Sequence, residues 1–166
     1  MYAEFHVPKS RIANVNLFVD QYVRQNLPLQ PRDAAVREAI RKGGYILSEA
    51  AGSALRAIIL ATGSEVELAM RAQKSLAEQN VPVRVVSMPC TTLFDRQDQV
   101  YRQSVLPPGI PRIAVEAGVT DGWRKYVLDA PVIGLDRFGE SAPAGELFKY
   151  FGFTVEKVVE AVRSVV

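Results

Sequence analysis

The chain has 166 residues, of which 48% are hydrophobic and 23% charged, and its formal net charge is +2. This length suits a single domain with its own core, and the composition is that of a soluble globular protein. The sequence has no cluster of basic residues and no apolar run near the roughly 20 residues of a membrane helix, so we expect neither a nucleic-acid nor a membrane partner. Cys90 is the single cysteine and cannot form an internal disulfide, which favours a cytoplasmic location.

The first part of the chain lacks the alternation of strand and helix patterns seen further on. Residues 1–23 carry scattered apolar positions, and we interpret them as an extension that is either artificial or native, the first being favoured. Residues 24–42 begin as a proline-containing linker. They end in a pattern that predicts a helix, with Asp33 as its N-cap and Gly43 just beyond its last turn.

Two strands and a helix are predicted next. Residues 43–50 mix aromatic and β-branched side chains behind two glycines, which indicates an edge strand that is free to run antiparallel to the others. Residues 55–62 are almost continuously apolar, a pattern typical of a strand covered on both faces. Residues 64–80 change to a helical period, with Ser64 and Glu67 spaced as a capping box.

The second half of the chain repeats this alternation. Further strands are predicted over residues 81–88, 112–118 and 131–136. Further helices are predicted over residues 94–108, 121–128, 143–152 and 154–166. Asp95 is the expected cap of the first of these helices, and Thr154 is the expected cap of the last. Strands that alternate with helices indicate right-handed crossovers, so the predicted fold is a three-layer α/β/α arrangement around a mostly parallel five-stranded sheet.

The stretch "ATGSEVE" at residues 61–67 joins a strand to a helix through a glycine turn, which is a common place for a bound phosphate. It lacks the further glycines of a dinucleotide fingerprint and the Gly-Lys-Ser/Thr ending of a P-loop. The expected capping box of Ser64 and Glu67 would occupy two helix donors, and Glu65 and Glu67 would repel an anion. A structural turn is therefore favoured over a phosphate site.

Catalytic and metal-binding groups are scarce in the regular part of the sequence. His6 is the single histidine and precedes the predicted domain, while Cys90 stands alone after a proline. No metal-ligand cluster and no nucleophile–base pair follow from this pattern, and no group of the regular domain is expected to titrate near neutrality. We therefore expect no catalytic residue and no metal site here, and we interpret Cys90 as a small, partly buried residue.

Polar residues gather where the predicted strands end, the edge at which open α/β sheets bind ligands. Thr62, Ser64, Glu116 and Ser141 are the candidate residues of a cleft for a small effector. Glu116 could form a binding pair or a plain ion pair with Arg137, and the ion pair is favoured. This cleft supports one of two functional hypotheses, a free-standing ligand-binding or regulatory module.

The other hypothesis comes from nine short motifs and their order along the chain. They are "RQNLP" (24–28), "GGYIL" (43–47), "ATGSEVELA" (61–69), "VRVVSMP" (83–89), "FDRQ" (94–97), "YRQSVLP" (101–107), "VEAG" (115–118), "FGESAPA" (138–144) and "FGFT" (151–154). Together they make residues 24–166 resemble the C-terminal domain of a bacterial-type transketolase. The resemblance implies that residues 24–42 lead from a middle domain, and that residues 43–166 are the C-terminal domain itself.

The resemblance also implies what the parent enzyme does. Transketolases move a two-carbon ketol unit between sugar phosphates, using thiamine diphosphate and a divalent cation, Mg or Ca. The family holds this cofactor between an N-terminal and a middle domain at a homodimer interface, so those domains are the implied partners and this chain binds no cofactor.

The remaining implications concern this chain's own residues. The arginine of "RQNLP", here Arg24, contacts the sugar phosphate in the family. The C-terminal domain itself is implied to be non-catalytic, contributing to packing and dimer architecture, and by itself this chain is expected to be inactive.

Overall fold

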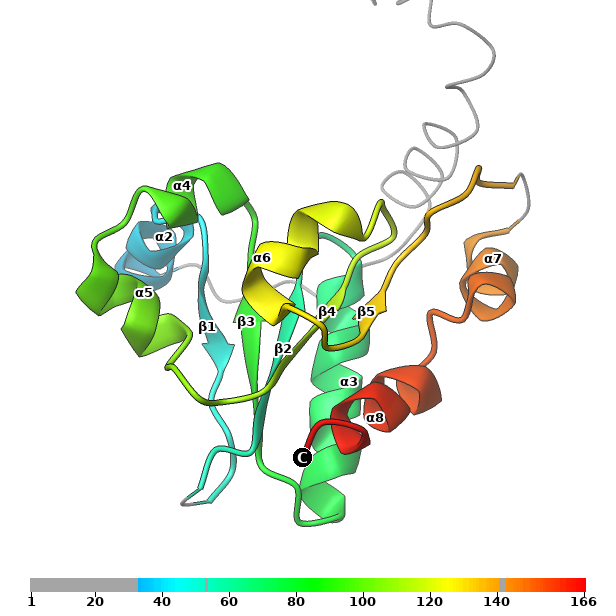
Figure 1. Ribbon diagram of the computed structural model, residues 1–166, viewed down its shortest axis with the longest axis horizontal. Helices are drawn as coiled ribbons and strands as arrows, with labels where there is room; N and C mark the ends of the chain where they lie inside the picture. Colours follow the sequence, from blue (N-terminus) through cyan, green and yellow to red (C-terminus); the bar gives the residue numbers. More distant parts are fainter. Residues whose placement is uncertain (1–32, 53, 141–142) are drawn as a thin grey trace, which may run out of the picture.

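The computed structural model describes residues 33–52, 54–140 and 143–166. The elements in chain order are α2 (Ala34–Arg41), β1 (Tyr45–Ser48), β2 (Ala57–Ala61), α3 (Glu65–Glu78), β3 (Val83–Ser87), α4 (Thr91–Asp95), α5 (Gln99–Val105), β4 (Arg112–Val115), the short 3-10 helix η2 (Asp121–Trp123), α6 (Arg124–Val127), β5 (Val132–Ile133), α7 (Ala144–Phe151) and α8 (Val155–Arg163). Within these residues one sheet lies between two layers of helices (Figure 1). The predicted extension at residues 1–23 falls outside the described part.

The sheet has the strand order β1-β3-β2-β4-β5. β2 pairs in parallel with both β3 and β4, and β5 continues the parallel part beyond β4. β1 alone runs antiparallel, with Tyr45 opposite Ser87 of β3. The predicted fold class is confirmed, including the antiparallel edge strand.

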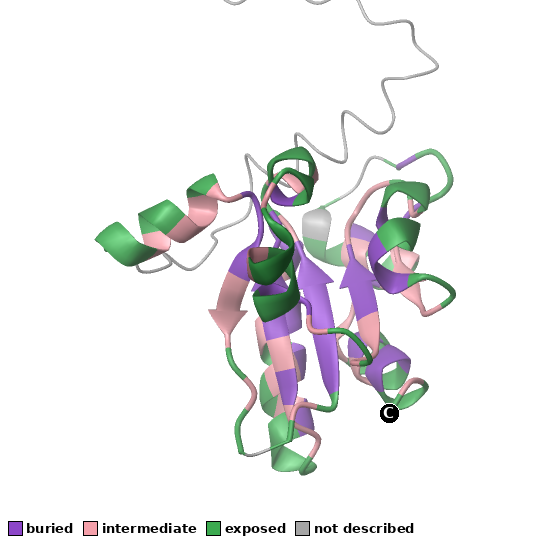
Figure 2. Cartoon of the chain, turned by 60° about the vertical axis from the view of Figure 1, so that its left-hand side comes forward, coloured by how far each residue is buried: buried purple, intermediate pink, exposed green. Residues whose placement is uncertain are grey.

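The strand β2 is the centre of the core, because all five of its residues have no exposed surface. Its alternate side chains point to opposite faces of the sheet. On one face Ile59 packs in a cluster with residues of α3, α7 and α8. On the other face Ile58 and Leu60 pack in a second cluster with residues of α4, α5 and α6. Figure 2 shows the resulting pattern, with buried central strands and exposed outer helix surfaces.

Two predicted helix caps are confirmed. The Asp33 side chain accepts a hydrogen bond from the Val36 amide (2.8 Å) at the start of α2. The Thr154 hydroxyl accepts one from the Lys157 amide (3.3 Å) at the start of α8. Each bond satisfies an amide that has no partner within its own helix.

The helix predicted over residues 94–108 is present as α5 and ends before Pro107, but its predicted start is wrong, because Asp95 belongs to a separate helix, α4. Asp98 caps α5 by accepting a hydrogen bond from the Tyr101 amide (2.7 Å). The expected cap, Asp95, is the last residue of α4, and its side chain accepts hydrogen bonds from Lys125 and Tyr126. Two aspartates, Asp95 and Asp98, precede α5 and could cap it. Because the Asp95 side chain is bound by Lys125 and Tyr126, Asp98 is the N-cap of α5.

Arg84 on β3 connects the segment after β1 to the end of α5. Its guanidinium forms two hydrogen bonds with the Glu49 carboxylate, at 2.9 and 2.8 Å, and donates to the carbonyls of Ser104 and Val105. The hydrogen bond from Arg84 is the largest cause that lowers the pKa of Glu49. The carboxylate of Glu49 thus neutralises the charge of Arg84 on β3 through two parallel hydrogen bonds, the geometry that a guanidinium favours.

Gly43 makes the close approach between the start of β1 and α4. It has φ +84°, and its carbonyl accepts a hydrogen bond from the Cys90 amide (2.9 Å). A Cβ atom at this position would overlap the Cys90 carbonyl and lie 2.6 Å from the Phe94 amide nitrogen. Both the backbone angle and the lack of space therefore require glycine.

We predict that Gly43→Ala destabilises the protein much more than Gly109→Ala. Gly109 has φ +78° but no atom within 4 Å of its added Cβ, so it isolates the strain of the backbone angle. That strain is about 1 to 2 kcal/mol, and the overlap at Gly43 should bring the loss to about 3 kcal/mol or more. Urea unfolding of both variants measures the difference, and equal losses would contradict the close approach.

Candidate functional site

The carboxyl edge of the sheet brings together part of the predicted cleft. Thr62 and Ser64 follow β2, and Glu116 follows β4 directly. β2 and β4 are paired neighbours, so these residues leave the sheet side by side. Ser141 lies outside the described residues, and the cleft itself stays a prediction.

Ser64 does not have the role in helix capping that its spacing suggests. Its backbone is already helical, at φ −71° and ψ −25°, and its side chain forms no capping bond with α3. The Ser64 hydroxyl instead donates a hydrogen bond to the Glu65 carboxylate (2.8 Å). The capping box of Ser64 and Glu67 is therefore wrong, because an N-cap residue that accepts from the helix needs an extended backbone.

Glu65 is the functional candidate that sequence reasoning missed. It is 3% exposed although it is charged and begins a helix, and Ser64 beside it is 4% exposed. Carboxylates are almost never fully buried unless other groups interact with them. The sequence shows Glu65 in the first turn of a predicted helix. Acidic residues are common at this position on exposed helices, so the position alone could not predict that Glu65 is buried.

Glu116 has a strongly perturbed pKa. Burial, and secondly the negative charge of Glu65, raise the pKa of Glu116 from 4.5 to about 8. Its Oε2 atom is buried and has no hydrogen-bond partner among the described residues. Near neutral pH this side chain is therefore mainly a protonated carboxylic acid, and the expectation that no group of the domain titrates in this range is wrong.

The predicted ion pair between Glu116 and Arg137 is also wrong. Arg137 pairs with Glu140 at 3.2 Å, three residues along the same exposed loop. Its guanidinium lies 5.7 Å from the centre of the Tyr150 ring and 5.5 Å from that of Phe151. A local partner and two aromatic faces thus hold the arginine away from Glu116, since exposed ion pairs form most easily between neighbours in sequence.

Ser64 also lines a hollow of about 380 Å³ between the start of α3 and the helices α7 and α8. The charged residues that line it are two cations, Arg71 and Lys149, and two carboxylates, Glu67 and Glu156. Because these charges balance, the hollow has no preference for an anion. This agrees with the interpretation of "ATGSEVE" as a structural turn.

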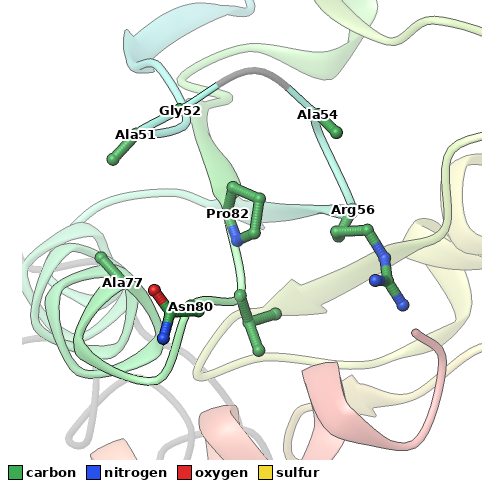
Figure 3. Close-up of a pocket in the computed structure, with 8 residues that line it drawn as sticks. Ala51, Gly52, Ala54, Arg56, Ala77, Asn80 and Pro82 are labelled. Carbon is green, nitrogen blue, oxygen red and sulfur yellow. The ribbon is translucent and has the colours of Figure 1, made fainter.

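The opposite edge of the sheet has a hollow of about 480 Å³. Figure 3 shows its lining, which comes from the loop ahead of β2, the end of α3 and the residues that lead into β3. Most of these side chains are small, such as Ala54 and Ala77, and Arg56 is the one charged residue among the described residues of the lining. The described residues of this lining offer no acid–base or nucleophilic group.

The described residues contain no group of three or more histidine, cysteine, aspartate or glutamate side chains that could hold a metal ion. Cys90 is a free, half-buried thiol just before α4. The carboxyl edge therefore offers one buried carboxylic acid, a neighbouring carboxylate and a serine hydroxyl. This set can hold or release a proton, but it lacks the nucleophile–base geometry of covalent catalysis.

Comparison with known proteins decides the family. A family model described as "Transketolase-like TK C-terminal domain" matches residues 43–154. The chain belongs to this family. Curated relatives include Transketolase 1 of Vibrio cholerae, 54% identical over 144 residues, and Transketolase 1 of Pasteurella multocida, 49% identical over 148 residues. The matches cover 86% and 87% of this chain but only 22% of each relative, so the transketolase C-terminal domain spans about a fifth of their length.

Solved structures agree with the transketolase C-terminal domain. A transketolase from Leishmania mexicana matches with a TM-score of 0.76 and 46% identity, over 86% of this chain and 20% of its own. A transketolase from Pichia stipitis matches with a TM-score of 0.75 and 39% identity, over 90% of this chain and 24% of its own. Among the described residues, none of the helices has the length and apolar character needed to pass through a membrane.

We predict that Glu116→Gln removes a pH-dependent loss of stability. In the unfolded chain the carboxyl ionises near its ordinary value of 4.5, whereas in the folded protein it stays protonated up to about pH 8. The unfolded state therefore binds fewer protons between these values, and the stability of the wild type falls as pH rises through this window. The stability of the variant relative to the wild type should increase by about 2 to 4 kcal/mol from pH 5 to pH 8.

Urea unfolding at pH 5, 6.5 and 8 measures this difference. Glu78→Gln removes an exposed carboxylate at the far end of α3 and checks for a general effect of lost charge. A constant difference between Glu116→Gln and the wild type, or an equal trend in the Glu78 variant, would contradict a raised pKa at Glu116.

Proposed function

We propose that this chain is the non-catalytic C-terminal part of a transketolase and serves in the packing and dimer architecture of the parent enzyme. The observation that carries this proposal is the unequal coverage of the matches, which include 86% of this chain but 22% of the Vibrio cholerae relative. In this proposal residues 24–42 lead from the middle domain, and residues 43–166 are the C-terminal domain.

The parent enzyme transfers a two-carbon ketol unit between sugar phosphates, with thiamine diphosphate and a divalent cation, Mg or Ca, as cofactors. Support comes from the Pichia stipitis transketolases, which were solved in complex with sedoheptulose-7-phosphate, xylulose-5-phosphate and fructose-6-phosphate. The described residues of this chain do not fit the cofactor, because no cluster of metal ligands exists among them. We therefore assign the cofactor to the N-terminal and middle domains, which are the partners of this chain in a cytoplasmic homodimer.

Two residue assignments belong to the same proposal. Arg24 contacts the phosphate of the sugar substrate in the assembled enzyme, a role that suits the two-point hydrogen bonding of a guanidinium. Thr62, Ser64, Glu116 and Ser141 form a cleft for a small effector. The buried, protonated carboxyl of Glu116 supports this cleft, since it can donate a hydrogen bond to a ligand at the carboxyl edge.

We predict that the chain alone neither binds the cofactor nor transfers ketol units. Isothermal titration with thiamine diphosphate and magnesium, followed by a ketol-transfer assay on the same sample, tests this. Full-length Vibrio cholerae Transketolase 1 is the positive control. Saturable binding or turnover by the chain alone would contradict a non-catalytic role.

We also predict that residues 43–166 can replace the matching part of the Vibrio cholerae relative. The two sequences are 54% identical, so the surfaces that face the other domains should be retained. The chimera should be a dimer with ketol-transfer activity, whereas the relative truncated before this part should lose stability or dimerisation. Sedimentation and activity assays of both proteins measure this, and a truncated relative that behaves like the full enzyme would contradict a role in packing.

A further inference from the structure

A second, differently charged pocket lies on the face of the sheet away from α3 and α8. It has a volume of about 440 Å³ and lies where α4, α5 and α6 meet the beginning of β4. Its charged lining residues are Arg102, Arg112, Lys125 and Asp95. Three cations and one carboxylate leave an excess of two positive charges, in contrast to the balanced hollow beside Ser64.

The single carboxylate of the pocket is already fully engaged. One Asp95 oxygen accepts from the Lys125 ammonium, and the other accepts from the Tyr126 hydroxyl at 2.8 Å. Its pKa is lowered by these hydrogen bonds against the opposing effect of burial, so it stays ionised. Asp95 therefore offsets the charge of Lys125 and leaves the two arginines without a carboxylate.

Arg112 contributes a cation whose hydrogen bonds go only to neutral groups. Its guanidinium donates to the carbonyls of Leu106 and Pro107, both at 2.9 Å, and of Tyr126 at 3.4 Å. Its Nε–H is buried and has no acceptor among the described residues. Because carbonyl oxygens do not neutralise a guanidinium, Arg112 maintains a positive potential at the base of the pocket.

Arg102 is the cation that remains available to a ligand. It lies on α5 with an exposed side chain, and that side chain forms no hydrogen bond or ion pair with the described residues. Its charge nevertheless acts on Asp95, which places it beside the charged cluster. An unpaired guanidinium at the rim of a positive pocket is suited to bind a phosphate or carboxylate through two hydrogen bonds.

The other lining residues restrict the ligand further. Gln99 and Gln103 are four residues apart on α5, so they lie on one face of the helix and present amide donors and acceptors together. Phe94 and Tyr126 line the pocket with largely buried rings. Amides beside aromatic carbon suit a compound with several hydroxyl groups, and the volume lies within the range of small-molecule sites.

We propose that this pocket binds a small phosphate monoester that carries hydroxyl groups, such as a pentose 5-phosphate. Arg102 binds the phosphate above the unneutralised charge of Arg112, and Gln99 and Gln103 bind the hydroxyls. The site is distinct from the carboxyl-edge cleft and from Arg24, and it goes beyond the proposed packing role. It gives the C-terminal domain a ligand of the same chemical class as the sugar phosphates of the parent reaction.

Titration calorimetry and amide chemical-shift mapping of the full chain with ribose 5-phosphate test the proposal, with inorganic phosphate and free ribose as comparison ligands. We expect saturable binding of ribose 5-phosphate, with shifts at residues 99–103 and 124–126. Arg102→Gln should weaken binding roughly tenfold or more, the usual effect of losing a charge-assisted contact. Lys74→Gln removes an equal charge from an exposed position on α3 and should leave binding unchanged.

Two further variants separate this site from the others. Gln103→Ala should weaken the binding of ribose 5-phosphate but not that of inorganic phosphate, since the amide contacts the hydroxyls. Arg24→Gln should leave binding to the pocket intact, whatever its effect on the parent reaction. The proposal would be overturned if the wild type did not bind ribose 5-phosphate, or if Arg102→Gln bound it as tightly as the wild type. Loss of binding in Arg24→Gln alone would also overturn it.

Discussion

Complete burial of β2 is the constraint on which the rest of the structure depends. All five residues of this strand have no exposed surface, so both faces of the sheet must be covered along its length. α3 and α8 cover one face, and α4, α5 and α6 cover the other. Polar groups are excluded from the strand itself and can appear only beyond its end. Ser64 and Glu65 therefore lie at the carboxyl edge, where the hydrogen bond between their side chains replaces part of the lost hydration.

The structure stabilises partly buried ionisable side chains in two different ways, by pairing opposite charges and by protonating a carboxylate. Arg84 and Glu49 form a two-point pair, in which each charge stabilises the other. Glu116 and Glu65 would repel each other if both were ionised. Burial and the charge of Glu65 raise the pKa of Glu116, so its protonated form is favoured and the repulsion is avoided. A stable fold does not need the second arrangement, since two apolar side chains of similar size would avoid the desolvation. The two neighbouring carboxyl groups, Glu65 and Glu116, distinguish this edge of the sheet from an ordinary strand–helix turn.

The sequence predicted the architecture because the apolar runs and their periods are local. The strands around residues 57–61 and 83–87 and the caps Asp33 and Thr154 required no knowledge of the partners. The errors concern side chains whose roles depend on distant residues. The pattern predicts Asp95 as the helix cap. Its actual role depends on its contact with Lys125 of α6, 30 residues along the chain, which the local sequence does not indicate. Likewise, the burial of Glu65 depends on tertiary packing, and the same spacing of acidic residues occurs on exposed helices.

The reversed direction of β1 has a geometrical consequence for whatever precedes it. Tyr45, the first residue of β1, lies opposite the last residue of β3, so the chain enters the sheet at the carboxyl edge. A parallel β1 would instead start at the edge that holds Arg56. α2 is thus joined to the sheet on the side of Glu116. The connection from α2 to the sheet is shorter by the length of this strand of 4 residues, roughly 13 Å, than a parallel strand would require.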